Sequence, residues 1–392
     1  MGMSSPPALP LPVASDLATP NREPSRLAGF AAKCGRGFDA LVGIATMVPV
    51  LAVISAIPLL NLLSHGYLLE ASGRVARSGR MRDGWIGLRG FAVLGKIVLA
   101  GWIALLPVRL VDSFWRDAEL IAPGSNNAIA LRALLVALLI VTSLHLFWAV
   151  IRGGKWRHFL WPAPLHFLRW LGSEFSWRPA ATSLVAAFRR LRLLHFFRLG
   201  LLGFAGAALW LVFPVLFLMA ASSLANPGIS FLLSLLGSLL LGAVVLYLPF
   251  LQTRFALTGQ FREFFDPLSV RLSFRKAPIA FWLALAASLL FALPLYLLKI
   301  ELTPAEVAWL PNVVFVLFTF PARLLLGWAL ARSERRDSPG AWGSRWAARF
   351  ASLPVVAVYV FVVWISQYLS WQGTMGLLEQ HAFLGPSPLP GL

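Results

Sequence analysis

Three ionisable side chains lie inside apolar stretches of this sequence, where a charge is costly and often serves a function: Lys96, His145 and Arg323. A long basic side chain near a helix end can extend its charge to water, so snorkelling is the favoured interpretation of Lys96 and Arg323. The alternative is a polar cavity or an internal anion contact. We interpret His145 as a hydrogen-bonding residue between helices, because no second histidine stands at a spacing suited to metal or haem.

The sequence offers no cluster of catalytic or metal-binding residues. None of the six histidines stands in a group with acids or the single cysteine, and no nucleotide-binding fingerprint or zinc-protease pattern occurs. Glu70 and Arg74 are four residues apart, which predicts a solvated ion pair on a helix. We therefore predict a non-enzymatic protein without catalytic residues, metal or cofactor, and a lipid-modifying enzyme remains the second alternative.

Composition sets the fold class. The chain has 392 residues, of which 58% are hydrophobic and 13% charged, whereas soluble domains carry about 25% charged residues. Cys34 is the only cysteine, so no disulfide can form within the chain. Eight apolar runs approach the roughly 20 residues that cross a bilayer as a helix. They cover 41–63, 91–111, 133–151, 199–224, 229–251, 279–298, 313–330 and 350–371. The prediction is an all-α, polytopic transmembrane helix bundle.

Charge alternates between the segments that join these runs. The net charge is +18, and lysine and arginine gather in 1–39, 64–90, 152–198, 252–278 and 332–349. The segments 112–130 and 299–311 are acidic instead. Basic segments stay in the cytoplasm, so the pattern predicts seven full crossings, a cytoplasmic N-terminus and an outside C-terminus in a bacterial inner membrane.

The first apolar run departs from this alternation because both of its flanks are basic. It also contains Pro49 and Pro58, and proline interrupts helical hydrogen bonding. We therefore predict a re-entrant hairpin of two half-helices, 40–54 and 58–72, that enters and leaves on the cytoplasmic side. The alternative is one long kinked crossing with the N-terminal tail outside, which would give eight crossings.

Domain organisation follows from these segments. Residues 1–39 are predicted to be a disordered cytoplasmic tail, 40–371 a single transmembrane domain, and 372–392 a short flexible tail. Within the domain, 152–198 mixes basic with aromatic residues, which is typical of helices lying in the membrane interface. We expect anionic lipid headgroups to contact the cytoplasmic face, and we expect no nucleic acid. The residues expected to make these contacts are Arg74, Arg77, Lys155, Arg157, Arg189, Arg190 and Arg192.

The sequence contains a weak internal similarity. Ile57-Pro58-Leu59-Leu60-Asn61 and Leu248-Pro249-Phe250-Leu251-Gln252 both lead into basic stretches. Internal repeats are frequent in transporters, so one interpretation is a duplication that pairs Pro58 with Pro249 and Asn61 with Gln252. Chance similarity between two leucine-rich segments is the other interpretation.

The stretch Gly66-Tyr67-Leu68-Leu69-Glu70, followed by Gly73-Arg74-Val75-Ala76-Arg77, carries a family resemblance. With the preceding proline-broken apolar run, it resembles a family of uncharacterised bacterial multi-pass membrane proteins, over about 40–110. The resemblance implies location and topology, and it carries over no catalytic residues.

The favoured function is a membrane subunit, scaffold or permease-like component, with a protein partner or a second copy of the chain. The alternative is a transporter or facilitator of a small anionic or amphipathic solute, in which Arg323 and Lys96 face a cavity. A polar cavity reaching Arg323 would favour transport. A closed bundle with an apolar flank would favour a subunit.

Overall fold

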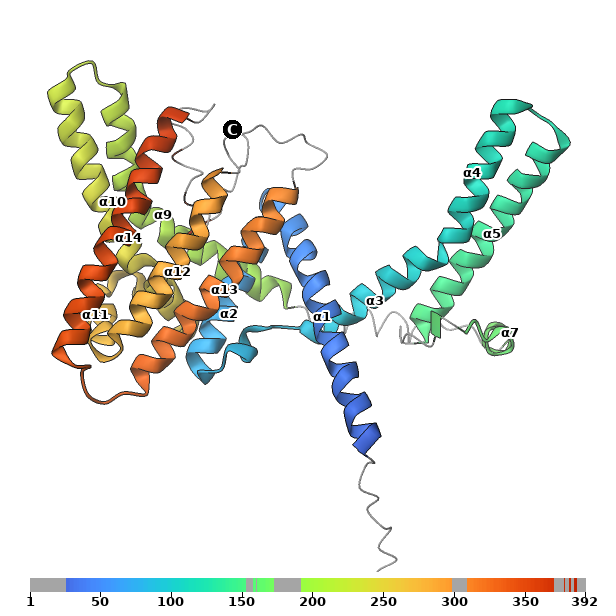
Figure 1. Ribbon diagram of the computed structural model, residues 1–392, viewed down its shortest axis with the longest axis horizontal. Helices are drawn as coiled ribbons and strands as arrows, with labels where there is room; N and C mark the ends of the chain where they lie inside the picture. Colours follow the sequence, from blue (N-terminus) through green and yellow to red (C-terminus); the bar gives the residue numbers. More distant parts are fainter. Residues whose placement is uncertain are drawn as a thin grey trace, which may run out of the picture.

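The computed structural model describes residues 26–152, 158–159, 161–172, 192–297, 309–369, 377, 381 and 384–385. All regular elements within these ranges are helices, and seven are long and apolar enough to span a membrane. An eighth candidate forms if α11 and α12, bent by 117° to one another, count as one span. The predicted fold class, an all-α polytopic bundle, is therefore confirmed (Figure 1).

The first half of the described chain contains α1 (Arg26–Ala56), α2 (Asn61–Ser78), the 3-10 helix η1 (Met81–Gly84), α3 (Leu88–Ala104), α4 (Leu106–Ile121), α5 (Asn126–Ile151) and α7 (Pro164–Gly172). The second half contains α9 (Leu193–Ser223), α10 (Pro227–Thr258), η2 (Phe261–Phe265), α11 (Pro267–Lys276), α12 (Pro278–Leu297), α13 (Trp309–Glu334) and α14 (Trp342–Leu369).

The segment 112–130, predicted as a loop, is mostly helical. Helix α4 continues to Ile121, and α5 begins at Asn126, so only a short turn separates them. The hydroxyl of Ser125 accepts a hydrogen bond from the Ala128 amide at 3.2 Å and caps α5. The acidic residues before the turn therefore lie on the last turns of α4.

Helices α1 and α2 form an antiparallel hairpin. The Ser55 hydroxyl donates to Ser64 at 2.8 Å near the turn, and the Tyr67 hydroxyl reaches the sulfur of Met47 at 3.0 Å further from it. This reversal agrees with two antiparallel helices rather than a single kinked crossing. Because Gly37–Ala56 is itself long and apolar enough to span a membrane, re-entry on the cytoplasmic side stays a prediction. Both helices are longer than predicted, because Pro49 lies within α1 and only Pro58 coincides with the break.

Helix α2 lies at the centre of the bundle, in contact with α1, α9, α10 and α13. Nearly all of its side chains are buried, including Asn61, His65 and Glu70. Helix α2 does not form an apolar run of its own in the sequence, because it carries polar residues. These residues face protein rather than lipid. The bundle therefore holds a polar helix inside a ring of apolar ones.

Glycine allows the surrounding helices to approach α2 closely. A Cβ atom built on Gly66 would lie 1.8 Å from the Phe196 carbonyl oxygen on α9, and one on Gly200 would lie 1.9 Å from that of Leu62. On the opposite side, a Cβ on Gly327 of α13 would lie 2.2 Å from the Ser72 carbonyl oxygen. Small residues at such crossings are the usual basis of helix packing in membranes.

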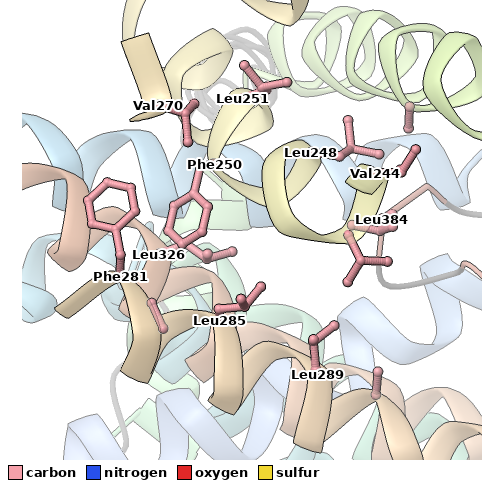
Figure 2. Close-up of a cluster of buried hydrophobic side chains, with 14 of the residues drawn as sticks. Val244, Leu248, Phe250, Leu251, Val270, Phe281, Leu285, Leu289, Leu326 and Leu384 are labelled. Carbon is pink, nitrogen blue, oxygen red and sulfur yellow. The ribbon is translucent and has the colours of Figure 1, made fainter. Parts of the chain in front are cut away.

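The largest apolar core joins α10 to α11, α12 and α13. Figure 2 shows Phe250 and Phe281 stacked in this core, with ring centroids 4.4 Å apart, and Val270 of α11 nearby. A second core surrounds Tyr67 between α1, α2 and α13, where Phe320 stacks on the tyrosine ring at 6.3 Å.

Helices α4 and α5 form an arm that stands apart from the bundle (Figure 1). They pack against each other, and α3 joins them to the bundle by packing on α1. In the most apolar stretch of α5 only 11% is buried within the protein, which is the smallest share among the seven candidate spans. The arm thus presents an apolar flank on both of its helices.

Several basic segments meet at one end of the bundle, formed by the C-terminal ends of α2, α10, α11 and α13, which we term the basic end. Arg77 donates to the carbonyl of Leu257 at the end of α10 at 3.2 Å, and Arg335 donates to that of Ser78 at 2.7 Å. Arg336 donates to the carbonyl of Lys276 at 3.2 Å. These arginines satisfy terminal carbonyls that would otherwise lack donors.

The two segments with internal similarity share a local structure, in a register that differs from the prediction. Helix α2 ends at Gly79 and continues into η1, and α10 ends at Gly259 and continues into η2. Matching the two glycines also aligns Tyr67 with Tyr247, Leu68 with Leu248, Arg74 with Arg254, Ala76 with Ala256, Arg82 with Arg262 and Asp83 with Glu263. The pairing of Pro58 with Pro249 is therefore wrong.

Candidate functional site

Arg323 lies in the interior of the bundle and is 2% exposed. Its Nη1 donates a hydrogen bond to the side-chain oxygen of Gln252 at 2.8 Å, and the Gln252 amide in turn donates to the carbonyl of Leu384. The guanidinium therefore forms its hydrogen bond with a protein side chain and does not extend to water. Snorkelling, the interpretation favoured by the sequence, is wrong for this residue.

The space beside Arg323 is very small. A cavity of about 10 Å³ lies between α10, α12 and α13, and its lining includes Ser288, Thr319 and Leu384. A single water needs about 10–15 Å³, so this cavity holds one water at most. In the described conformation the bundle is closed around Arg323.

His65 is a buried polar residue on α2 that the sequence analysis did not select. It is 3% exposed, and its Nε2 has no hydrogen-bond partner among the described residues. The ring lies beside Gly203, where a Cβ atom would be 3.3 Å from Nε2. The sequence signal was available, because Ser64 and His65 interrupt an otherwise apolar run.

Lys96 and His145 each have a defined partner. The ammonium of Lys96 on α3 forms an ion pair with Asp39 on α1. His145 Nε2 lies 2.7 Å from the carbonyl oxygen of Phe159. His145 thus forms a hydrogen bond, as predicted, and its partner is a backbone carbonyl. Neither residue lies near Arg323 in a shared cavity, since neither lines the space beside it.

Glu70 gathers three cationic or polar side chains inside the bundle. Its Oε1 accepts from Arg74 Nε at 2.9 Å and from Arg77 Nη2 at 3.0 Å, and its Oε2 lies 3.4 Å from His195 Nε2 on α9. The Glu70 side chain is only 7% exposed. The prediction of a solvated pair is therefore wrong, and the carboxylate links α2 to α9.

The residues predicted to contact anionic lipid fall into three groups. Arg74 and Arg77 are engaged by Glu70. Arg192 is exposed at the start of α9 with a positive φ of 50°. The remaining four, Lys155, Arg157, Arg189 and Arg190, lie outside the described residues. Within 152–198 the structure describes the short helix α7, and its position in the membrane interface stays a prediction.

A second polar site on the described chain was not predicted from the sequence. A pocket of about 650 Å³ opens between α10, α11, α12 and α14, and four arginines line it: Arg271, Arg275, Arg345 and Arg349. A sequence signal existed, because each pair is spaced four residues apart and so shares one helix face. We term this site the basic pocket.

Comparison with protein-family models, with curated proteins and with solved structures found no significant match. Within the described ranges, no three histidine, cysteine or acidic residues are grouped so that they could hold a metal ion.

Proposed function

We propose that this chain is a non-enzymatic, multi-pass protein of a bacterial inner membrane that serves as a subunit or scaffold for another membrane protein. The single observation that carries the proposal is the exposed arm of α4 and α5. The closed interior around Arg323 supports the same conclusion, because a solute pathway needs a polar cavity larger than one water.

The charge distribution supports an orientation with the basic end in the cytoplasm. Arg77, Arg335 and Arg336 meet there, and cytoplasmic segments are enriched in lysine and arginine. With α1 leading away from this end and α2 returning to it, the N-terminus would be cytoplasmic. The seventh candidate span, α14, would then bring the C-terminus outside.

Orientation can be tested with the single natural cysteine. A membrane-impermeant maleimide should label Cys34 only after the cells are permeabilised. In a Cys34→Ser background, Ser125→Cys at the tip of the arm should be labelled in intact cells. Labelling of Cys34 from outside would reverse the proposed orientation.

The arm argues for a protein partner rather than for lipid alone. Lipid tails are as apolar as leucine, so a lone helix pair gains little by folding away from the bundle. A second membrane protein packed on α5 would stabilise that position through close van der Waals contact. Val141 on α5 is 63% exposed, so its side chain is available to such a partner.

Site-specific photo-crosslinking in native membranes tests this role. A photoreactive residue at Val141 should give one defined protein adduct that also co-purifies stoichiometrically in mild detergent. Phe213 on α9 is equally exposed, at 63%, and serves as the matched control position. Adducts to lipid only, or equal adducts at both positions, would contradict the proposal.

A facilitator for a small anionic solute is the second candidate, favoured by the buried polar residues of α2 beside Arg323. Its test is flux of small anions into proteoliposomes. We expect no flux above that of protein-free liposomes. Flux that falls on Arg323→Ala would instead support the facilitator.

A further inference from the structure

The four arginines of the basic pocket differ from Arg77, Arg335 and Arg336, which bind helix carbonyls at the basic end. In the part of the chain that the structure describes, none of them forms an ion pair, and none donates a side-chain hydrogen bond. Arg345 is the clearest case, since its Nε is buried without a partner. The pocket therefore holds guanidinium groups whose N–H donors are not taken up by acceptors of the described chain, although Arg349 stacks on aromatic rings.

Among the described residues that line this pocket, none is acidic. Its other polar lining is the hydroxyl of Ser352 and the tyrosine of α10, Tyr247. The acid nearest in sequence is Asp266, whose carboxylate caps α11 by accepting from the Ser269 amide at 3.0 Å. The pocket is thus strongly positive, and an anion with several oxygen acceptors complements it.

Aromatic side chains frame the arginines. Trp282, Trp342 and Trp346 line the pocket, and the Arg349 guanidinium lies 5.1 Å from the centre of the Trp346 ring. Tryptophan concentrates at the level of lipid headgroups, where its apolar ring and its N–H group are both satisfied. The pocket therefore has the composition of a membrane interface.

The basic pocket continues into an apolar groove between α10 and α14. The two cavities share Leu246 and Leu353 in their lining, and the groove has a volume of about 720 Å³. It runs along α14 from Leu353 to Trp364, which is about 16 Å at the rise of an α-helix. That length is close to half of the roughly 30 Å hydrocarbon core, the depth of one leaflet.

We infer that the basic pocket and the groove together form a binding site for one anionic phospholipid of the leaflet at the basic end. The phosphate-bearing headgroup binds the four arginines, and an acyl chain lies in the groove between α10 and α14. This inference does not depend on the proposed subunit role, because it concerns the opposite side of the bundle from the arm (Figure 1).

The headgroup decides the selectivity of such a site. Before it binds, the acyl chain is already surrounded by the acyl chains of neighbouring lipids. Its transfer into the groove therefore gains little from the hydrophobic effect. Guanidinium groups, in contrast, form bidentate hydrogen bonds to phosphate oxygens. We therefore expect lipids with the same chains and different headgroup charge to bind with different affinity, and this difference to shrink at high salt.

Native mass spectrometry of the full chain in mild detergent tests the inference. The probes are dioleoyl phosphatidylglycerol, which is anionic, and dioleoyl phosphatidylethanolamine, which has no net charge. Arg345→Gln with Arg349→Gln should lower phosphatidylglycerol affinity about thirtyfold, from the effect expected of two basic residues near an anionic surface. Arg82→Gln with Arg262→Gln removes the same charge from exposed positions at the basic end and should change affinity less than threefold.

A separate substitution tests the role of the groove. Ala357→Phe narrows the groove without changing charge, so it should weaken binding of the dioleoyl lipid. Inorganic phosphate at millimolar concentration should not displace the lipid. Displacement by phosphate would mean an anion site without lipid specificity and would overturn the inference.

Three further results would also overturn it: equal affinity for the two lipids, equal effects of the two arginine pairs, or no effect of Ala357→Phe. If the Arg345 and Arg349 variant does not purify as a folded protein, Arg271→Gln with Arg275→Gln on the exposed helix α11 replaces it, with the same expected loss.

Discussion

Gly79 and Gly259 end helices α2 and α10 in almost the same left-handed conformation, with φ and ψ of 68° and 13° in the first and 72° and 9° in the second. In both, the glycine amide donates to the carbonyl four residues earlier at 2.7 Å. The residue that follows is extended, with ψ of 119° at both Arg80 and Gln260. The two halves of the bundle thus use one helix-ending device.

Replacing Gly259 with alanine should destabilise the protein by about 1–2 kcal/mol, because a Cβ atom disfavours the left-handed region. No atom lies within 4 Å of the new methyl group, so the cost is conformational rather than steric. The apparent melting temperature in mild detergent measures it. Gly90→Ala, in the helical and equally open part of α3, is the control and should not lower stability. Equal stability of the Gly259 variant and the wild type would contradict this account.

Replacing Gly66 or Gly200 with alanine should cost more, about 3 kcal/mol or above, because each methyl group would overlap a backbone carbonyl of the facing helix. A backbone carbonyl cannot change rotamer to avoid the methyl group as a side chain can, so α2 and α9 must move apart. Gly101→Ala on α3 meets open space and provides the control. We expect loss of folded protein for Gly66→Ala and full recovery for Gly101→Ala, measured by size-exclusion chromatography. Wild-type recovery of both variants would show that the crossing is looser than described.

The elements that face lipid could be predicted from the sequence, and the elements that face protein could not. Wherever the structure describes them, the eight apolar runs are mostly helical, and the clearest break is the turn between α1 and α2 inside run 41–63. Helix α2 was predicted only as half of a hairpin, since Asn61, His65 and Glu70 reduce its apolar character. Burial by α9, α10 and α13 is a tertiary property, and the spacing of residues along α2 does not reveal it.

The candidate sites follow the same division. Arg323 was selected because a cation in an apolar run is visible in the sequence, but its position near Gln252 depends on how α10 packs on α13. The similarity between α2 and α10 was predicted in another register, because the matched prolines were more prominent than the matched glycines. The basic pocket was missed, since Arg271 and Arg345 come from different helices and only the fold brings them together.

Arg323→Ala should destabilise the protein by about 2–4 kcal/mol. The substitution removes a charged hydrogen bond to Gln252 and leaves a cavity in a closed interior. Arg323→Met fills most of the volume and should recover part of the loss, which separates the packing contribution from the polar one. Arg332→Ala is the control. Arg332 lies in the last turn of the same helix, α13, and stacks on Trp328, so its replacement should lower the free energy of unfolding by less. If Arg323→Ala were as stable as the wild type, the residue would not hold α13 to α10.

Glu70→Gln should also destabilise the protein, because one carboxylate oxygen serves two guanidinium groups. Without that negative charge, Arg74 and Arg77 would face each other across the amide, and His195 would lose an acceptor. Breaking a buried ion pair by removing one partner costs about 3–5 kcal/mol, and the exposure of the arginine side chains lowers this to about 1–3 kcal/mol here. The double variant Glu70→Gln with Arg74→Gln removes the repulsion and should be more stable than Glu70→Gln alone. A double-mutant cycle on melting temperature measures the coupling. Additive effects of the two substitutions would mean that Glu70 and Arg74 do not interact energetically, and would contradict the proposed ion pair.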